Sequence, residues 1–188
     1  NISPLIPVGG EIIVNEVMIN PDGFPDTFTK WFELRNLTDE YFDLTGSTLS
    51  SKGRAHVITY PLILEPGGFM SFASSMDTSI NGGANHDYSF GADSGDLNFG
   101  TGLDWVQLNA SDGEMVDIVN WDSNNGWPMP NGAALQLSAG LVPDGENHIN
   151  PAVWCEATVV YGNGSNMGTP GGANTTCLTG NETAPTLT

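Results

Sequence analysis

The chain has 188 residues, 39% of them hydrophobic, and 22 acidic residues against 4 Lys or Arg give it a formal net charge of −18. This length suits one domain with a substantial core, while the charge repels phosphate backbones and anionic membrane surfaces and so makes nucleic acid a poor partner. Because no apolar run approaches the ~20 residues of a membrane span, membrane insertion is excluded as well.

The two ends of the chain differ in composition from its middle. Residues 1–10 and 178–188 are rich in Pro, Gly and Thr and have no hydrophobic periodicity, which is typical of linkers. We therefore expect a single domain over residues 11–177, excised from a longer polypeptide that carries further domains.

The region 11–49 predicts the first strands. β-branched residues, among them Ile12 and Val17, favour a strand that the turn residues 20–23 end. A second strand is expected over 31–35, and a further extended segment follows from Phe42 to Leu49.

The rest of the chain repeats the pattern of a short strand followed by a Gly, Asn, Asp or Pro turn. Further strands are expected at 56–64, with Pro61 marking an edge or bulge, at 69–73, in a hairpin of 104–108 with 114–120, at 132–138 and within 152–160. The long region 74–102 is expected to be irregular, with Tyr88, Phe90, Leu97 and Phe99 as its anchors. Since no segment has helical apolar spacing, the pattern predicts an all-β, antiparallel β-sandwich.

The chain has two cysteines, Cys155 and Cys177. A disulfide between them is favoured over a pair of free thiols. The low lysine content suits a secreted or cell-surface protein. So does the presence of Asn-x-Ser/Thr sequons, such as those at Asn36, Asn109 and Asn163.

A family resemblance runs through these segments in order. The strands IIVNEV and WFELRN, the hairpin DWVQLNASDGEMVDIVNW and the terminal GTPGGAN resemble the lamin-tail domain family in its bacterial secreted form, over roughly residues 11–177. This resemblance implies an immunoglobulin-like β-sandwich that serves as an accessory module in large surface proteins. It also implies that the following are recurrent polar and turn positions: Asn15, Glu16, Glu33, Asn36, Asp43, Gly46, Asp104 and Gly113.

Glu16 and Glu33 are the candidates for catalysis. They lie on strands expected to pair, so their carboxylates could approach each other as a glycosidase pair does. The competing interpretation, that each is solvated or bonded to a turn, is favoured, with Arg35 as a partner for one of them. No Gly-x-Ser-x-Gly elbow occurs and the three histidines are scattered, so we assign no nucleophile and no zinc site.

Two candidate binding sites lie in loops. Asp93, Asp96 and Asn98 offer oxygen ligands for Ca²⁺, although an acidic surface also serves solubility. Trp127, in the loop 124–130, is the tryptophan that would stack on a carbohydrate, while the other four are expected mainly in the core.

The sequence thus predicts a non-catalytic extracellular interaction or spacer module of a larger protein. Its partner would be a protein or carbohydrate at the cell surface, no cofactor is required, and Ca²⁺ is the candidate ion. The alternative is a hydrolase domain that uses Glu16 and Glu33, or a metal held by the acidic loops.

Overall fold

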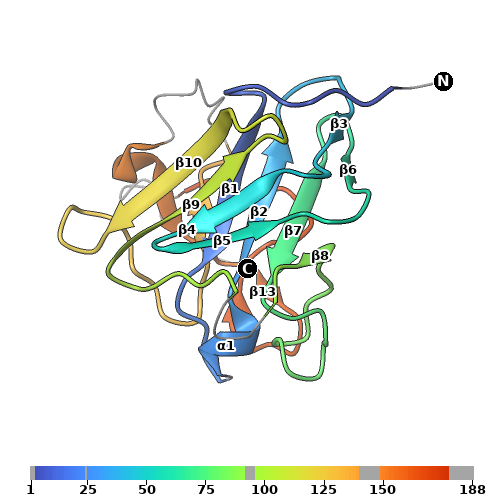
Figure 1. Cartoon of the computed structure of the whole chain (residues 1–188). Coiled ribbons are helices and arrows are strands. Elements are labelled where there is room, and N and C mark those ends of the chain that lie inside the picture. The colour runs from blue at the N-terminus through green and yellow to red at the C-terminus, as the bar shows by residue number, and fades with distance from the viewer. Residues whose placement is uncertain (1–2, 24, 92–95, 140–148, 178–188) are drawn as a thin grey trace, which may run out of the picture.

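Strands dominate the computed structural model, which describes residues 3–23, 25–91, 96–139 and 149–177 (Figure 1). The strands are β1 (Ile12–Met18), β2 (Trp31–Asn36), β3 (Phe42–Asp43), β4 (Thr48–Ser51), β5 (Arg54–Val57), β6 (Ile63–Leu64), β7 (Phe69–Ala73), β8 (Tyr88–Ser89), β9 (Leu103–Asn109), β10 (Met115–Asp122), β11 (Leu135–Leu137), β12 (Trp154–Glu156), β13 (Val160–Tyr161) and β14 (Asn166–Met167). The helices α1 (Asp26–Thr29) and η2 (Pro151–Val153) are single turns. Across the described ranges no helix has the length and apolarity to cross a bilayer.

Two sheets pack face to face. One has six strands in the order β12-β11-β1-β2-β7-β8, and the other has four in the order β10-β9-β4-β5. In Figure 1 the four-stranded sheet lies in front of β1, β2 and β7. All pairings within the two sheets are antiparallel except that of β7 with β8. The predicted all-β sandwich is therefore confirmed.

The core fills the space between the sheets because apolar residues alternate along the strands. Val17 and Phe32, which face each other on β1 and β2, are fully buried, as are Val106 and Leu108 on β9. The Phe32 ring stacks on Phe72, with 5.2 Å between their centroids. Burial of this apolar surface is the main stabilising term of the fold.

The long region 74–102 is held by its aromatic residues, as the sequence predicts. Within its described residues it forms only β8, and the anchors Tyr88, Phe90, Leu97 and Phe99 are all buried. Apart from β8, which pairs with β7, the described backbone of this region lies over the core without belonging to a sheet.

The prediction of one strand over residues 56–64 is wrong. The segment forms β5 in the four-stranded sheet and β6, which pairs with β3, with Pro61 between them. The pairing of β5 already ends at Val57, and Pro61, which has no N–H to donate to a ladder, lies in the connection to β6.

The segment 157–177 crosses the outer face of the six-stranded sheet. Ala157, Tyr161 and Met167 pack there against Trp31 and Met18, in a small apolar cluster separate from the main core. Gly168 lies so close to Trp31 that an added Cβ would come within 2.8 Å of its ring. The close contact requires glycine at this position.

The N-terminal segment expected to be a linker takes part in the fold. Leu5 pairs with the strand β3 through hydrogen bonds of 2.8 Å from its N–H to Tyr41 O and 2.9 Å from the Asp43 N–H to its carbonyl. The chain therefore joins the fold before residue 11. Residues 178–188 lie outside the described residues.

Candidate functional site

Glu16 and Glu33 lie directly opposite each other on β1 and β2, as the sequence predicts. A β-bulge at Asn15 shifts the register of β1 between Val14 and Glu16. Such a bulge leaves one residue unpaired and re-aims its side chain, and here the Asn15 amide reaches Glu33. Both carboxylates are fully buried on the outer side of the six-stranded sheet.

The loop 168–174, which we call the cap, binds both carboxylates through its backbone and side chains. The Thr169 N–H donates to Glu16 at 3.0 Å, and the Thr169 hydroxyl donates to Glu16 Oε2 at 2.8 Å. The N–H groups of Gly171 and Gly172 donate to Glu33 Oε2 at 2.6 and 3.2 Å. Each carboxylate thereby receives the hydrogen bonds that a buried polar group needs.

Asn174 anchors the end of the cap. Its Nδ2 donates to the carbonyls of Asn15 and Leu137, both at 2.8 Å, and its Oδ1 accepts from Asn15 Nδ2 at 3.0 Å. Asn15 Nδ2 in turn donates to Glu33 Oε1 at 2.8 Å. The two asparagines thus link β1, β2, β11 and the cap in one hydrogen-bonded network.

Burial dominates the electrostatics of the pair. Desolvation raises the pKa of Glu16 from 4.5 to about 7, against the hydrogen bonds from Thr169, which lower it. Desolvation, and then the charge of Glu16, raise the pKa of Glu33 from 4.5 to about 8, against the hydrogen bonds from Asn15, Gly171 and Gly172. The pair therefore retains at least one proton near neutral pH.

A substrate cannot reach these carboxylates while the cap is in place. Their oxygens are occupied by donors from the cap and from Asn15, and both residues have no exposed surface. Arg35, the expected partner of one of them, lies instead over the Phe69 ring, with its guanidinium carbon 5.4 Å from the centroid. The arrangement matches the interpretation of strand carboxylates bonded to a turn, here one distant in sequence.

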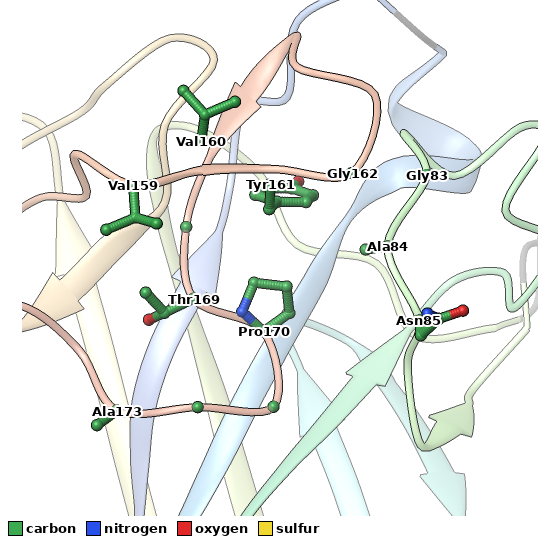
Figure 2. A pocket seen from close by; sticks show the side chains of 13 residues that line it. Gly83, Ala84, Asn85, Val159, Val160, Tyr161, Gly162, Thr169, Pro170 and Ala173 are labelled. Carbon is green, nitrogen blue, oxygen red and sulfur yellow. The ribbon is translucent and has the colours of Figure 1, made fainter.

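A pocket of about 440 Å³ lies beside the cap (Figure 2). It is lined by residues 83–85, 159–162 and 168–173. Figure 2 shows Tyr161 and Pro170 between the 83–85 loop on one side and Val159 and Thr169 on the other. Among the described residues that line it there is no Asp, Glu, His, Lys or Arg, and burial raises the pKa of Tyr161 to about 12. The described lining therefore offers an uncharged surface for binding.

The disulfide between Cys155 and Cys177 is formed in the structure, with Cα atoms 5.7 Å apart. It joins β12, at the edge of the six-stranded sheet, to the residues just after the cap. Beside it Gln136 Nε2 donates to Thr175 Oγ1 at 2.7 Å. The cap segment is thus held at its end by a covalent bond and by side-chain hydrogen bonds.

The tryptophans are distributed differently from the expectation. Trp127 is only 9% exposed, and its ring packs on Trp154 at 5.8 Å between centroids. The expectation that the Trp127 ring is exposed is therefore wrong. Sugar binding at Trp127 stays a prediction, and little of the ring is accessible to a sugar. Trp31, Trp121 and Trp154 are buried as expected, whereas Trp105 is partly exposed on β9.

The expected calcium ligands are described only in part. Asp93 lies outside the described residues, while the backbone carbonyls of Asp96 and Asn98 accept hydrogen bonds from Arg54 and Ser51. In the part of the chain that the structure describes, no three His, Cys, Asp or Glu residues form a group that could hold a metal ion. Calcium binding stays a prediction.

The histidines lie apart, as the sequence predicts for those that the structure describes. His56 Nε2 is 2.8 Å from the Tyr88 hydroxyl, whereas His86 packs beside Trp31 and its buried ring nitrogens have no hydrogen-bond partner. Burial lowers the pKa of His86 to about 4, so its ring is neutral at pH 7. His148 lies outside the described residues.

Sequence reasoning did not assign the cap residues to the carboxylates. The sequence does mark the cap, because the segment from Gly168 to Asn174 is a run rich in Gly, with Thr, Pro and Asn, near the end of the domain. Its target could not be read, since Thr169 lies 153 residues from Glu16.

A comparison with protein families gives one finding. A family model described as Lamin Tail Domain matches residues 7–123. The matched region contains both carboxylates and the four-stranded sheet, and it ends before β11 and the cap. A search of curated proteins finds no match.

Proposed function

The chain belongs to the lamin tail domain family, whose fold is immunoglobulin-like, and on that premise we propose that it is a non-catalytic interaction module of a larger extracellular protein. Domains of this fold typically bind other molecules through their surfaces, whereas their chemistry depends on the sites they carry. The partner would be a protein or a carbohydrate at a cell surface.

The observation that carries this proposal is the burial of the carboxylate pair. A glycosidase needs two carboxyl groups flanking the substrate's glycosidic bond. Here Glu16 and Glu33 have no exposed surface and bind backbone N–H groups of the cap. Their role is to fix the cap onto β1 and β2, which is a structural task.

Two features support the extracellular location. The Cys155–Cys177 disulfide persists most readily in an oxidising compartment. The net charge of −18 also suits a protein that must stay dispersed outside the cell.

The proposal can be tested by comparing wild type with the Glu33→Gln variant for hydrolysis of a panel of glycosides, esters and peptides. We expect no turnover above background for either protein, together with a lower melting temperature for the variant. The temperature falls because Oε2 of Glu33 accepts from the cap and Oε1 accepts from Asn15 Nδ2, so whichever oxygen becomes an NH₂ group faces a donor. Wild-type turnover that a folded Glu33→Gln variant lacks would establish the hydrolase alternative.

Calcium dependence is the finer part of the proposal and concerns Asp93, Asp96 and Asn98. An ion that binds only the folded protein raises its melting temperature by mass action. We expect the melting temperature to be higher in millimolar Ca²⁺ than in EDTA. Equal values would remove calcium from the proposal and leave the interaction role intact.

A further inference from the structure

The outer face of the four-stranded sheet is a second surface with a distinct composition. Leu49, Val106, Leu108 and Val119 are fully buried and point into the core, so their neighbours along each strand point outward. Strand register aligns these outward residues into one surface, which we call the Trp105 face. It consists of Thr48, Ser50, Ala55, Val57, Leu103, Trp105, Gln107, Asn109, Met115, Ile118, Asn120 and Asp122.

The Trp105 face is almost free of charge. Asp122, at the end of β10, is the single ionisable residue among the twelve, although the chain carries 22 acidic residues. The Asp122 carboxylate accepts hydrogen bonds from the side-chain amides of Asn124 and Asn125. A basic partner would therefore find only one counter-charge among the twelve residues of this face.

The remaining side chains combine apolar surface with amides and hydroxyls. Leu103, Met115 and Val57 are 55, 53 and 49% exposed. Met115 and Val57 lie at one end of the face, in the row of Thr48 and Asn109. Toward the other end Trp105 follows Leu103 on β9 and is partly exposed. Across the β9–β10 ladder its direct partner is Asn120, whose side chain is exposed, and Gln107 follows on the same face of β9.

This composition fits an uncharged polyhydroxylated chain better than a second copy of this protein. Two copies, each with a net charge of −18, repel each other over the distance of a face-to-face contact. A neutral sugar chain meets no such repulsion. Its apolar ring faces can cover an indole while its hydroxyls exchange hydrogen bonds with amides.

We infer that the Trp105 face binds a neutral polysaccharide, with the Trp105 indole stacked on a sugar ring and Gln107 and Asn120 hydrogen-bonded to its hydroxyls. The inference rests on the proposed function and names the ligand class of that interaction module. Trp105 thus replaces Trp127, which is buried, as the candidate for stacking on a sugar. Among the tryptophans of the described residues, it is the one that is partly exposed on a sheet.

The test measures binding of soluble neutral polysaccharides, namely mixed-linkage β-glucan, galactomannan and dextran, by affinity electrophoresis and titration calorimetry. Alginate serves as the acidic comparison. The variants are Trp105→Ala and Gln107→Ala. Tyr60→Ala is the matched control, because Tyr60 is a 47% exposed aromatic residue outside the face.

We expect at least one neutral polysaccharide to bind and alginate to bind far more weakly. Trp105→Ala should raise the Kd by about tenfold or more, as loss of one stacking contact does. Gln107→Ala should raise it several-fold, and Tyr60→Ala should leave it unchanged. Melting curves of all three variants establish that they are folded.

Wild-type affinity in a folded Trp105→Ala variant would overturn the inference, as would equal binding of alginate or no binding of any neutral polysaccharide. A dimer in sedimentation that Trp105→Ala abolishes would assign the face to a second copy instead, and would also overturn it. These results leave the interaction-module proposal standing. Cleavage of a bound polysaccharide would have the opposite effect, since it contradicts the non-catalytic role alone.

Discussion

The outer faces of the two sheets differ in their charged residues and in what covers them. On the six-stranded sheet, Glu16 and Glu33 are buried, and the later segment 157–177 covers them and supplies hydrogen-bond donors. On the four-stranded sheet, the Trp105 face has one acidic residue and keeps large apolar side chains exposed. Paired strand carboxylates can therefore belong to the architecture, while a nearly uncharged face is the better candidate for recognition.

The pH dependence of stability gives the strongest test of the covered face. Both glutamates have folded pKa values, about 7 and about 8, above the ordinary 4.5, so the folded protein holds protons that the unfolded chain releases. The stabilisation of the folded state by these two protonated groups is fully present below pH 4.5. It is lost as the pH rises through their pKa values in the folded protein. The free energy of unfolding therefore falls with rising pH within that window. Melting temperatures should fall from pH 5 to pH 9.

The Glu16→Gln variant sharpens this measurement. Its Oε1 can still accept from the Thr169 N–H, and its NH₂ can donate to the Thr169 hydroxyl, so the cap contacts are kept. We expect a shallower pH slope and a higher melting temperature than wild type at pH 9. Glu156→Gln, at an exposed position on β12, is the control and should keep the wild-type slope. Parallel slopes for all three proteins would show that the pair does not titrate in this range.

Removal of the disulfide tests how the covering segment is held. The Cys155→Ser, Cys177→Ser double variant loses a link across 22 residues, which is worth about 3 kcal/mol by the chain-entropy estimate. The melting temperature should fall by roughly 6–12 °C in a chain of this size. Calorimetry in the absence of reducing agent makes the comparison. A fall below about 2 °C would mean that the hydrogen bonds of the cap hold the segment without the disulfide.

Asn174 tests the hydrogen-bonded network of the cap by itself. The Asn174→Ala variant removes the amide that donates to the carbonyls of Asn15 and Leu137, and the loss of these two buried hydrogen bonds should cost about 1–3 kcal/mol in the free energy of unfolding. Asn163→Ala, in an exposed turn, should cost less than about 0.5 kcal/mol. Urea denaturation of both variants measures the difference. Equal costs would contradict a special role for Asn174.

The Trp105 face should show the smallest effect on stability. Gln107 bonds to Asn109 on its own strand, and both side chains are partly exposed. Gln107→Ala should therefore change the free energy of unfolding by less than about 0.5 kcal/mol. The same urea experiment checks this value. A loss above 1 kcal/mol would mean that this face serves the fold as the covered face does.

Local patterns were sufficient for the longer strands and for the carboxylate pair, although not for the segment 56–64. Alternation of apolar residues marks β1, β2, β9 and β10, and the turn at 109–113 fixes the hairpin between the last two. Because β1 and β2 are neighbours in sequence, the opposition of Glu16 and Glu33 followed from their pairing. With two cysteines in the chain, only one intramolecular disulfide was available.

The two tryptophans show where such patterns stop. Trp127 lies among Asn, Gly and Pro, which indicates a loop, and a loop residue is usually exposed. Its burial depends on Trp154, which lies 27 positions further on and comes from the edge strand β12. Trp105 alternates with Val106 along β9, and alternation alone does not tell which of the two faces the second sheet.

The strand content, the main hairpin, the one available disulfide and the acidic, lysine-poor character of the protein follow from its sequence, because they depend on composition and on short-range periodicity. The sealing of the carboxylates by the cap and the position of Trp105 on a nearly uncharged outer face follow from the three-dimensional fold alone. Both outcomes depend on contacts between residues far apart in the chain. Solvent exclusion and hydrogen-bond pairing act through space, so a carboxylate's function is set by what the fold brings to it.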